Sequence, residues 1–147
     1  REKLIPTLNQ WIFKEEKIVF TNGCFDILHR GHIDYLAKAA SLGTKLIIGL
    51  NTDDSIRRLK GVNRPINDQE ARAILLASLI FTDKIILFEE DTPFDLIRFI
   101  QPDILVKGND YQPENIVGYD IVKAKGGEVI TIELTPGFST TSILNKI

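Results

Sequence analysis

The sequence is poor in the side chains that cross-link a protein or bind a metal ion. Its 147 residues contain one cysteine, Cys24, and two histidines, His29 and His32. A single cysteine cannot form an internal disulfide bond, which fits a reducing, cytoplasmic setting. A zinc site needs three or four protein ligands, so these three residues would need a carboxylate such as Asp26 or Asp34 to complete one.

Long apolar runs and an excess of one charge are also missing. No run approaches the roughly 18 apolar residues that span a membrane, and the start, REKLIPTLNQW, lacks the apolar segment of a signal peptide. The net charge of −2 gives no sign of a nucleic-acid partner. We therefore expect a cytoplasmic domain that acts on small molecules and contacts neither nucleic acid nor a membrane. Because the first residue is not methionine, we expect either a trimmed start or a longer parent protein.

The sequence does contain a regular alternation of strand-like and helix-like segments. The strand-like segments are short β-branched runs, typical of buried parallel strands: KIVFT (17–21), KLIIGL (45–50), KIILF (84–88), DILVK (103–107) and EVITIEL (128–134). Helical patterns lie at 31–42, 68–80, 93–100, 113–125 and from 139 onward, with a weaker one at 4–14. Asn67 and Glu70 form a capping-box pattern at the start of the second. This order predicts a Rossmann-like α/β fold, a doubly wound parallel five-stranded sheet with helices on both faces.

Polar residues follow each predicted strand. They are TNGCFD, NTDD, EED, KGNDY and TPGFSTT, in chain order. Ligands in such sheets bind beyond the carboxyl ends of the strands, where the strand order reverses. We therefore expect these five segments to converge on one ligand site.

The segment HRGH, residues 29–32, follows the first predicted strand and opens a helix. His29 and His32 are three residues apart and share a helix face, and Gly31 lets a ligand approach the backbone. The helix N-terminus adds free N–H groups and partial positive charge, so the segment suits phosphate. Three alternatives stay open: the zinc site, a nucleophile pair of Cys24 with a histidine, and two histidines that only cap the helix.

Each of the other polar segments could be either an ordinary structural feature or part of the ligand site. Lys60 lies in a polar loop, where a lysine is usually solvated. Lys107 brings a cation to the sheet edge, although the turn Gly108–Asp110 after it is common in its own right. Ser139 or Thr140 would cap the last helix.

Arg72 lies on the first turns of the helix predicted at 68–80, whose apolar face is formed by Ile74, Leu75 and Leu79. It is either a solvent-facing partner in an i,i+4 pair or a ligand for substrate.

Together, these motifs resemble those of the HxGH nucleotidyltransferases, a superfamily related to class I aminoacyl-tRNA synthetases. In order and spacing they are similar to the adenylyltransferase domains of bifunctional heptose 7-phosphate kinase/heptose 1-phosphate adenylyltransferases. The matching segments beyond HRGH are RLKGVNRP, FEEDTP, PDILVKGNDY, IVGYDIV and KGGEVITIELTPGFSTTSI. The match runs from about residue 10 to the end, and it implies an N-terminal helical extension, 1–16, before a nucleotidyltransferase domain, 17–147.

The resemblance implies a reaction. ATP and D-glycero-β-D-manno-heptose 1-phosphate would give ADP-heptose and pyrophosphate, for lipopolysaccharide core synthesis. Mg²⁺ is expected as cofactor because it bridges triphosphate oxygens with few protein contacts, and the sequence shows no carboxylate set dedicated to it. A separate or fused heptose kinase is an expected partner, and so is a second copy of the chain in a homodimer, although no apolar stripe identifies that interface.

The resemblance also implies residue roles. Nucleotidyl transfer needs donors and cations around the phosphates rather than a nucleophilic side chain. The catalytic residues would be His29, His32, Lys60 and Lys107. The ATP contacts would be Cys24 and Phe25 (through backbone N–H groups), His29, Gly31, His32, Lys107, Gly108, Asn109, Asp110, Ser139, Thr140 and Thr141. The sugar-phosphate contacts would be Asn22, Asp26, Lys60, Arg64 and Arg72. Related sequences carry glycine where Asn109 stands, a mild departure if Asn109 adopts left-handed geometry.

Two other functions stay open. One keeps the enzyme class: a cytidylyltransferase of glycerol or ethanolamine phosphate, or a guanylyltransferase of heptose phosphate. Leu134, where glycerol-phosphate cytidylyltransferases have an arginine, favours the heptose branch. The other is a non-catalytic module that binds ATP, against which the intact HRGH, Lys60, Lys107 and STT motifs argue.

Overall fold

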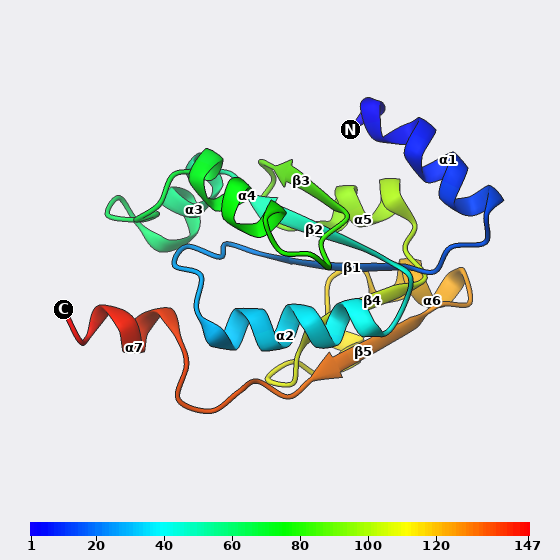
Figure 1. Ribbon diagram of the computed structural model, residues 1–147. Helices are drawn as coiled ribbons and strands as arrows, with labels where there is room; N and C mark the ends of the chain where they lie inside the picture. The colour runs from blue at the N-terminus through cyan, green and yellow to red at the C-terminus, as the bar shows by residue number, and fades with distance from the viewer.

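The computed structural model describes residues 1–147 as a parallel five-stranded sheet between two layers of helices (Figure 1). The strands are β1 (Ile18–Gly23), β2 (Lys45–Asn51), β3 (Lys84–Phe88), β4 (Ile104–Gly108) and β5 (Glu128–Ile132). Their order across the sheet is β3-β2-β1-β4-β5, and every neighbouring pair is parallel. The predicted Rossmann-like sheet is confirmed, and the strand order reverses at β1, between β2 and β4.

Seven α-helices and two short 3₁₀ turns, Glu2–Leu4 and Pro113–Asn115, connect the strands. The helices are α1 (Ile5–Phe13), α2 (Arg30–Ser41), α3 (Asp53–Lys60), α4 (Gln69–Ala77), α5 (Phe94–Ile100), α6 (Tyr119–Ala124) and α7 (Thr140–Leu144). None of them combines the length and apolar character that crossing a bilayer requires.

The two faces of the sheet form two separate cores. Side chains alternate along a strand, so Ile18 and Phe20 of β1 face one core while Val19 between them faces the other. The first core is closed by α1, α5 and α6, and the second by α2 and α4 (Figure 1). Residues 1–16, which we separated as an extension, contribute Leu4 and Trp11 to the first core.

Three helix predictions need correction. The segment 53–60, for which we predicted no helix and where we placed Lys60 in a loop, is helix α3. Thr52 caps it by accepting from the N–H of Ser55. The helix predicted at 113–125 is broken by Gly118, whose φ of 93° is left-handed, so α6 begins only at Tyr119.

Helix α4 differs from its prediction at its start and on its buried face. Asp68, not Asn67, is the N-cap, and its side chain accepts from the N–H of Ala71 at 2.8 Å. Ile74 is 61% exposed and Leu75 is also exposed, so the predicted apolar face was wrong for both. Leu79 does pack against the second core, but the buried positions of the helix are Arg72 and Leu76.

Candidate active site

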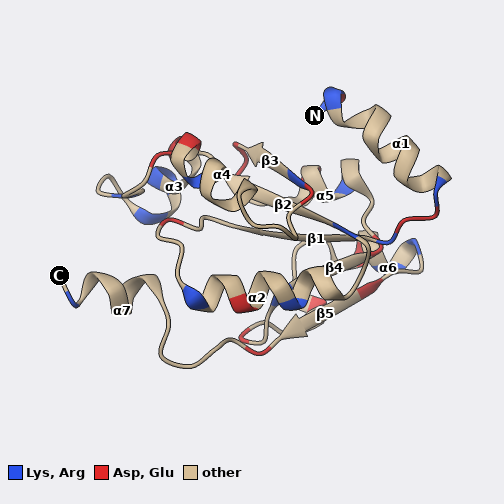
Figure 2. Cartoon of the chain, viewed as in Figure 1, with Lys and Arg blue, Asp and Glu red and all other residues tan.

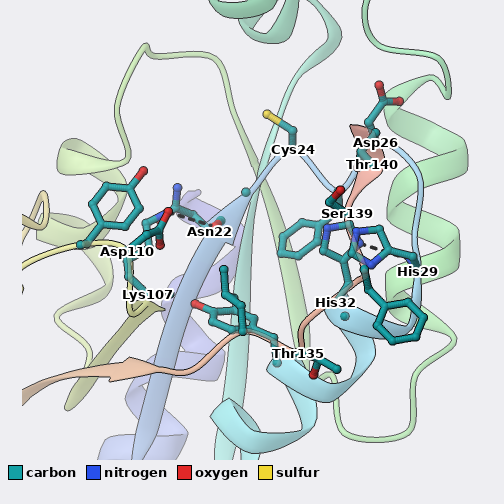
Figure 3. Close-up of a pocket in the computed structure, with 18 of the residues that line it drawn as sticks. Asn22, Cys24, Asp26, His29, His32, Lys107, Asp110, Thr135, Ser139 and Thr140 are labelled. Carbon is teal, nitrogen blue, oxygen red and sulfur yellow. Dashed lines mark hydrogen bonds between the residues drawn. The ribbon is translucent and has the colours of Figure 1, made fainter. Parts of the chain in front are cut away.

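A pocket of about 330 Å³ opens at the carboxyl ends of the strands, where β1 lies between β2 and β4. In Figure 3, Asn22, Lys107 and Asp110 lie on one side of the end of β1, and the two histidines with Ser139 and Thr140 on the other. The lining residues are Asn22, Gly23, Cys24, Phe25, Asp26, His29, Gly31, His32, Tyr35, Lys60, Lys107, Gly108, Asp110, Tyr111, Leu134, Thr135, Phe138, Ser139 and Thr140. The segments after β1, β4 and β5 therefore converge as predicted, whereas NTDD after β2 and EED after β3, which we also expected there, do not line the pocket.

The two histidines are packed against each other at the start of α2. Their rings stack with centroids 3.7 Å apart, and the backbone N–H of His29 donates to Nδ1 of His32 at 3.3 Å. This bond leaves Nε2 of His32 as the nitrogen that carries the proton of a neutral ring. Nδ1 of His29 is buried and has no protein partner. Buried polar atoms are nearly always bonded, so this atom is a place where a ligand is expected.

Both rings are neutral at physiological pH. Burial lowers the pKa of His32 to about 4, with further lowering by the nearby positive charges of His29 and Lys60, against a smaller opposing effect of the Ile27 carbonyl. Burial also lowers the pKa of His29. The histidine pair therefore offers hydrogen bonds rather than positive charge to a ligand.

The turn between β1 and α2 presents backbone donors to the pocket. The N–H groups of Cys24 and Phe25 have no acceptor in the protein. Phe25 has a left-handed φ of 46°, which is costly for an aromatic residue and recurs at functional sites. Its ring packs over Gly23 and edge-on against His32, with centroids 5.1 Å apart. The turn is thus fixed by packing and suited to an anion.

Asp26 lines the pocket, but its carboxylate is occupied by the protein. It accepts from Nε of Arg64 at 2.7 Å and from the N–H groups of Ile66 and Asn67 at 2.8 and 3.0 Å. Burial alone would raise the pKa of Asp26, but these backbone donors and the Arg64 guanidinium outweigh it and hold the pKa below its ordinary value. The carboxylate therefore anchors the loop from α3 to α4, and direct binding of sugar phosphate or metal, which we predicted for it, finds no support in this geometry.

Two lysines bring positive charge to the pocket. Lys107 at the end of β4 donates to the Asn22 carbonyl at 3.4 Å, and burial lowers its pKa although Cys24 and Asp110 favour its charged form. Lys60, placed by prediction in a loop, is the exposed last residue of α3 and reaches the pocket rim. Figure 2 shows further basic residues on α3 and at the start of α2, at the same end of the sheet.

Arg72 and Arg64 were predicted to bind substrate, and neither lines the pocket. Arg72 is 1% exposed, so the solvent-facing interpretation is wrong, and its guanidinium is bonded to the protein on all sides. Arg64 is bonded to Asp26. We placed the apolar face of α4 from the spacing of its apolar residues. That prediction was wrong because a buried arginine, Arg72, occupies a position where an apolar side chain is usual.

Two predicted ATP contacts, Asn109 and Thr141, also lie outside the lining. The N–H of Asn109 donates to the Ile132 carbonyl at 2.9 Å and extends the pairing of β4 with β5. The φ of Asn109 is not left-handed. Asn109 therefore does not adopt the backbone geometry that we expected at a position where related sequences carry glycine.

The segment after β5 closes the pocket over α2. Ser139 caps α7 as predicted, accepting from the N–H of Ser142 at 2.9 Å, and the hydroxyl of Thr135 donates to Asp34 on α2 at 3.0 Å. A Cβ at Gly31 would lie 2.9 Å from the His29 ring and 3.1 Å from Cβ of Phe138. Gly31 therefore makes room for these two side chains, and it also lines the pocket, where we expected it to meet a ligand.

Six lining residues were not predicted: Gly23, Tyr35, Tyr111, Leu134, Thr135 and Phe138. Tyr35 lies beneath the pocket, where its hydroxyl pairs with Thr21 at 2.8 Å; burial raises its pKa. Thr135 and Phe138 lie close to the STT motif in the sequence, so inspection of the residues next to that motif could have identified them. Tyr35 sits one turn past His32 on α2, a position that looked like ordinary core.

No three histidine, cysteine, aspartate or glutamate side chains gather closely enough to hold a metal ion by themselves. The zinc hypothesis for Cys24, His29 and His32 therefore has no ligand set.

The sheet topology is Rossmann-like, and the pocket at its carboxyl edge suits a phosphate-bearing ligand, as in nucleotidyltransferases. Residues 20–146 match the cytidylyltransferase-like family, and the chain belongs to it. The whole chain is 52% identical to "Bifunctional protein HldE" of Wolinella succinogenes and 51% identical to the protein of that name from Syntrophotalea carbinolica. It spans about 30% of the length of each of these relatives.

Two solved structures share the fold. A lipopolysaccharide core biosynthesis protein from Thermoplasma volcanium GSS1 is 29% identical, with a TM-score of 0.64 over 82% of this chain and 97% of that one. A protein of unknown function from Archaeoglobus fulgidus is 20% identical, with a TM-score of 0.53 over 78% of this chain and 97% of that one. The second likeness concerns the fold alone.

Proposed function

We propose that this chain is a heptose 1-phosphate adenylyltransferase. It transfers AMP from ATP to D-glycero-β-D-manno-heptose 1-phosphate and releases pyrophosphate. The relatives named HldE, at 51–52% identity across the whole chain, support this substrate pair. The observation that carries the proposal is the pocket, where buried Nδ1 of His29 and Oδ1 of Asn22 lack protein partners beside the free N–H groups of Cys24 and Phe25.

The transfer needs no covalent enzyme intermediate. An oxygen of the sugar phosphate attacks the α-phosphorus of ATP in line, the bond from that phosphorus to the bridging oxygen breaks, and pyrophosphate leaves with the electron pair. A phosphate near neutral pH is already largely deprotonated, so no general base is required. The protein has to hold two anions together and to stabilise charge on the phosphoryl oxygens.

The pocket supplies donors and cations for this task. The neutral rings of His29 and His32 donate to the triphosphate, and the N–H groups of Cys24 and Phe25 to the α-phosphate. Lys60 at the rim offsets the charge of the sugar phosphate. Lys107, at the end of β4, offsets that of the nucleotide.

The remaining lining residues have roles in recognition. Ser139 and Thr140 bind the β- and γ-phosphates, and Gly108 with Asp110 borders the base or ribose. Asn22, at the end of β1, contacts the sugar phosphate through its side-chain oxygen or nitrogen.

Mg²⁺ fits this site as a partner of ATP rather than as a resident ion. Of the two carboxylates in the lining, that of Asp26 is occupied by its N–H donors, whereas that of Asp110 accepts no hydrogen bond from the protein. Mg²⁺ commonly takes one carboxylate, waters and phosphate oxygens, so Asp110 is the residue that would hold it. The ion supplies charge neutralisation of the triphosphate.

The partners follow from the same relatives. The curated relatives are about three times as long as this chain, which supports a fused or separate heptose kinase that acts at an earlier step, before the 7-phosphate is removed. A homodimer stays part of the proposal, and sedimentation velocity of the purified chain tests it.

The test is a pyrophosphate-release assay that crosses ATP, CTP and GTP with heptose 1-phosphate and glycerol 3-phosphate. We expect release only with ATP and heptose 1-phosphate, abolished by EDTA and restored by Mg²⁺. Release with CTP and glycerol 3-phosphate would identify a cytidylyltransferase instead. No release with any pair, together with tight ATP binding by calorimetry, would identify a non-catalytic nucleotide-binding module.

A further inference from the structure

Arg72 is the bulkiest of the fully buried side chains, and its side chain is 0% exposed. Burying a guanidinium is unfavourable unless it is paired and fully hydrogen-bonded. An aliphatic side chain would fill the same position on α4 without that cost. The contacts that Arg72 makes therefore indicate what the position is for.

The guanidinium joins four segments that meet behind the pocket. Nη1 donates to the carbonyls of Cys24 at 2.9 Å and Asn51 at 2.7 Å, at the ends of β1 and β2. Nε donates to the Asn67 carbonyl at 2.9 Å, just before α4, and Nη2 to Oδ1 of Asp53 at 2.7 Å, at the start of α3. A planar fork with five fixed donors can serve these acceptors together, and a lysine ammonium cannot.

The bond to Cys24 has a direct geometric consequence for the pocket. The carbonyl of Cys24 and the N–H of Phe25 belong to one planar, trans peptide unit, so they point in opposite directions. Arg72 holds the carbonyl on the side of α4. The N–H of Phe25 is thereby aimed the other way, and it has no acceptor in the protein. Phe25 is kept at a left-handed φ of 46°, which such external bonds help to maintain.

A second set of bonds ties the same arginine to the loop that follows Lys60. The Asn67 carbonyl that Arg72 holds belongs to a residue whose N–H and side-chain Nδ2 both donate to Asp26, at 3.0 and 2.8 Å. Asp26 lies one residue beyond Phe25. The turn between β1 and α2 and the loop from α3 to α4 are therefore fixed against one another through one guanidinium.

We propose that Arg72 is a positioning residue for adenylyl transfer: by holding the Cys24 carbonyl, it directs the Phe25 N–H at the α-phosphate of ATP. This inference rests on the proposed function where it is tested by turnover. The test by the Phe25 amide resonance requires only that the protein binds ATP. A donor aimed at a phosphoryl oxygen gains strength as charge builds there, so its loss lowers kcat more than it weakens ATP binding.

The test compares Arg72→Lys with a matched control, Leu76→Ala, one turn further along α4. Leu76 is 1% exposed and belongs to the second core, and its apolar side chain makes no hydrogen bond to either turn. We expect Arg72→Lys to lower kcat at least tenfold while the Kd of ATP changes less than threefold. Leu76→Ala should lower Tm but leave kcat of the folded protein within twofold of wild type. A kcat for folded Arg72→Lys within twofold of wild type would overturn the proposal.

A direct readout uses ¹⁵N-labelled protein and ATP without the sugar phosphate. ATP should shift the Phe25 amide resonance in the wild type and in Leu76→Ala, and leave it nearly unshifted in Arg72→Lys. An equal shift in all three would overturn the proposal even if the wild type proved to have no transferase activity. Such an inactive wild type would refute only the proposed function.

If Arg72→Lys does not fold, Asp53→Asn tests the same network from a partly exposed partner outside the pocket. We expect its kcat to fall at least threefold with the Kd of ATP unchanged. Wild-type turnover in this variant, with an unaltered Phe25 amide response to ATP, would count against the positioning role.

Discussion

The imidazole rings of His29 and His32 stack face to face, with centroids 3.7 Å apart and planes inclined by 20°. The arrangement is stable because neither ring is charged: burial lowers the pKa of both, and each proton would repel the other. The N–H of His29 fixes the orientation of His32 through Nδ1. The pair therefore presents its hydrogen-bonding groups as one rigid unit. Replacing His29 and replacing His32 should have different effects on activity.

The first prediction concerns His32→Ala. His32 is held between the His29 ring and the edge of Phe25, so its position is better determined than that of His29. If His32 donates to the phosphoryl group as proposed, its loss should lower kcat/KM at least tenfold while circular dichroism shows a folded protein. Steady-state kinetics equal to the wild type would remove His32 from the phosphate-binding role.

The second prediction concerns the pH dependence of stability. The pKa of His32 is lowered from 6.5 to about 4 in the folded protein, so between these values the unfolded chain binds the proton and the folded chain does not. The contribution of His32 to the free energy of unfolding is complete above pH 6.5 and is lost as the pH falls toward 4.

Urea titrations of the wild type and His32→Gln at pH 7.5, 6, 5 and 4.5 measure this effect. The variant should lose less stability than the wild type over this interval, because glutamine does not titrate. Parallel losses in the two proteins would mean that the histidine is not held neutral.

The third prediction concerns Cys24→Ser. Cys24 faces the pocket through its backbone, whose carbonyl Arg72 holds and whose N–H is free. Serine preserves both groups, so we expect kcat and KM within threefold of the wild type. Loss of turnover with intact ATP binding would instead revive the nucleophile pair of Cys24 with a histidine.

The fourth prediction concerns Gly31→Ala. The added methyl group would lie 2.9 Å from the His29 ring and 3.1 Å from Phe138, distances at which one of them has to move. We expect kcat/KM to fall at least tenfold with little loss of secondary structure. Ala37→Ser, on the exposed face of the same helix, is the control and should leave kcat/KM unchanged. If Gly31→Ala retained full activity, the stacked geometry of the histidines would not matter for turnover.

The sheet was predictable because its strands depend on local composition. Runs such as KLIIGL (45–50) are buried on both faces and need no partner to be recognised. Helix α3 was missed for the opposite reason: DDSIRRLK buries only Ser55 and Ile56, so its apolar signal is too weak.

The pocket residues divide in the same way. His29, His32 and Ser139 were found because their chemistry is tied to a helix start. Arg72 was misassigned because three of its four partners are backbone carbonyls, which no side-chain pattern records. Asp26 was misassigned because its partners lie about forty residues away, in the loop from α3 to α4.

The fifth prediction concerns Asp26→Asn. The carboxylate is buried and accepts from Arg64, Ile66 and Asn67, so the amide would turn an N–H₂ group toward donors and leave the Arg64 charge unpaired. We expect a loss of about 2–4 kcal/mol in the free energy of unfolding at pH 7.

The pH dependence separates this electrostatic loss from simple misfit. Because the pKa of Asp26 is held below its ordinary 3.8, its stabilising effect is fully present above that value and is lost as the pH falls through the lowered pKa. The difference between wild type and Asp26→Asn, measured by urea unfolding, should be constant from pH 7 to 5 and shrink below pH 4. A difference that stayed constant down to pH 2.5 would show that the charge of Asp26 contributes nothing, and that only the shape of the side chain holds the loop.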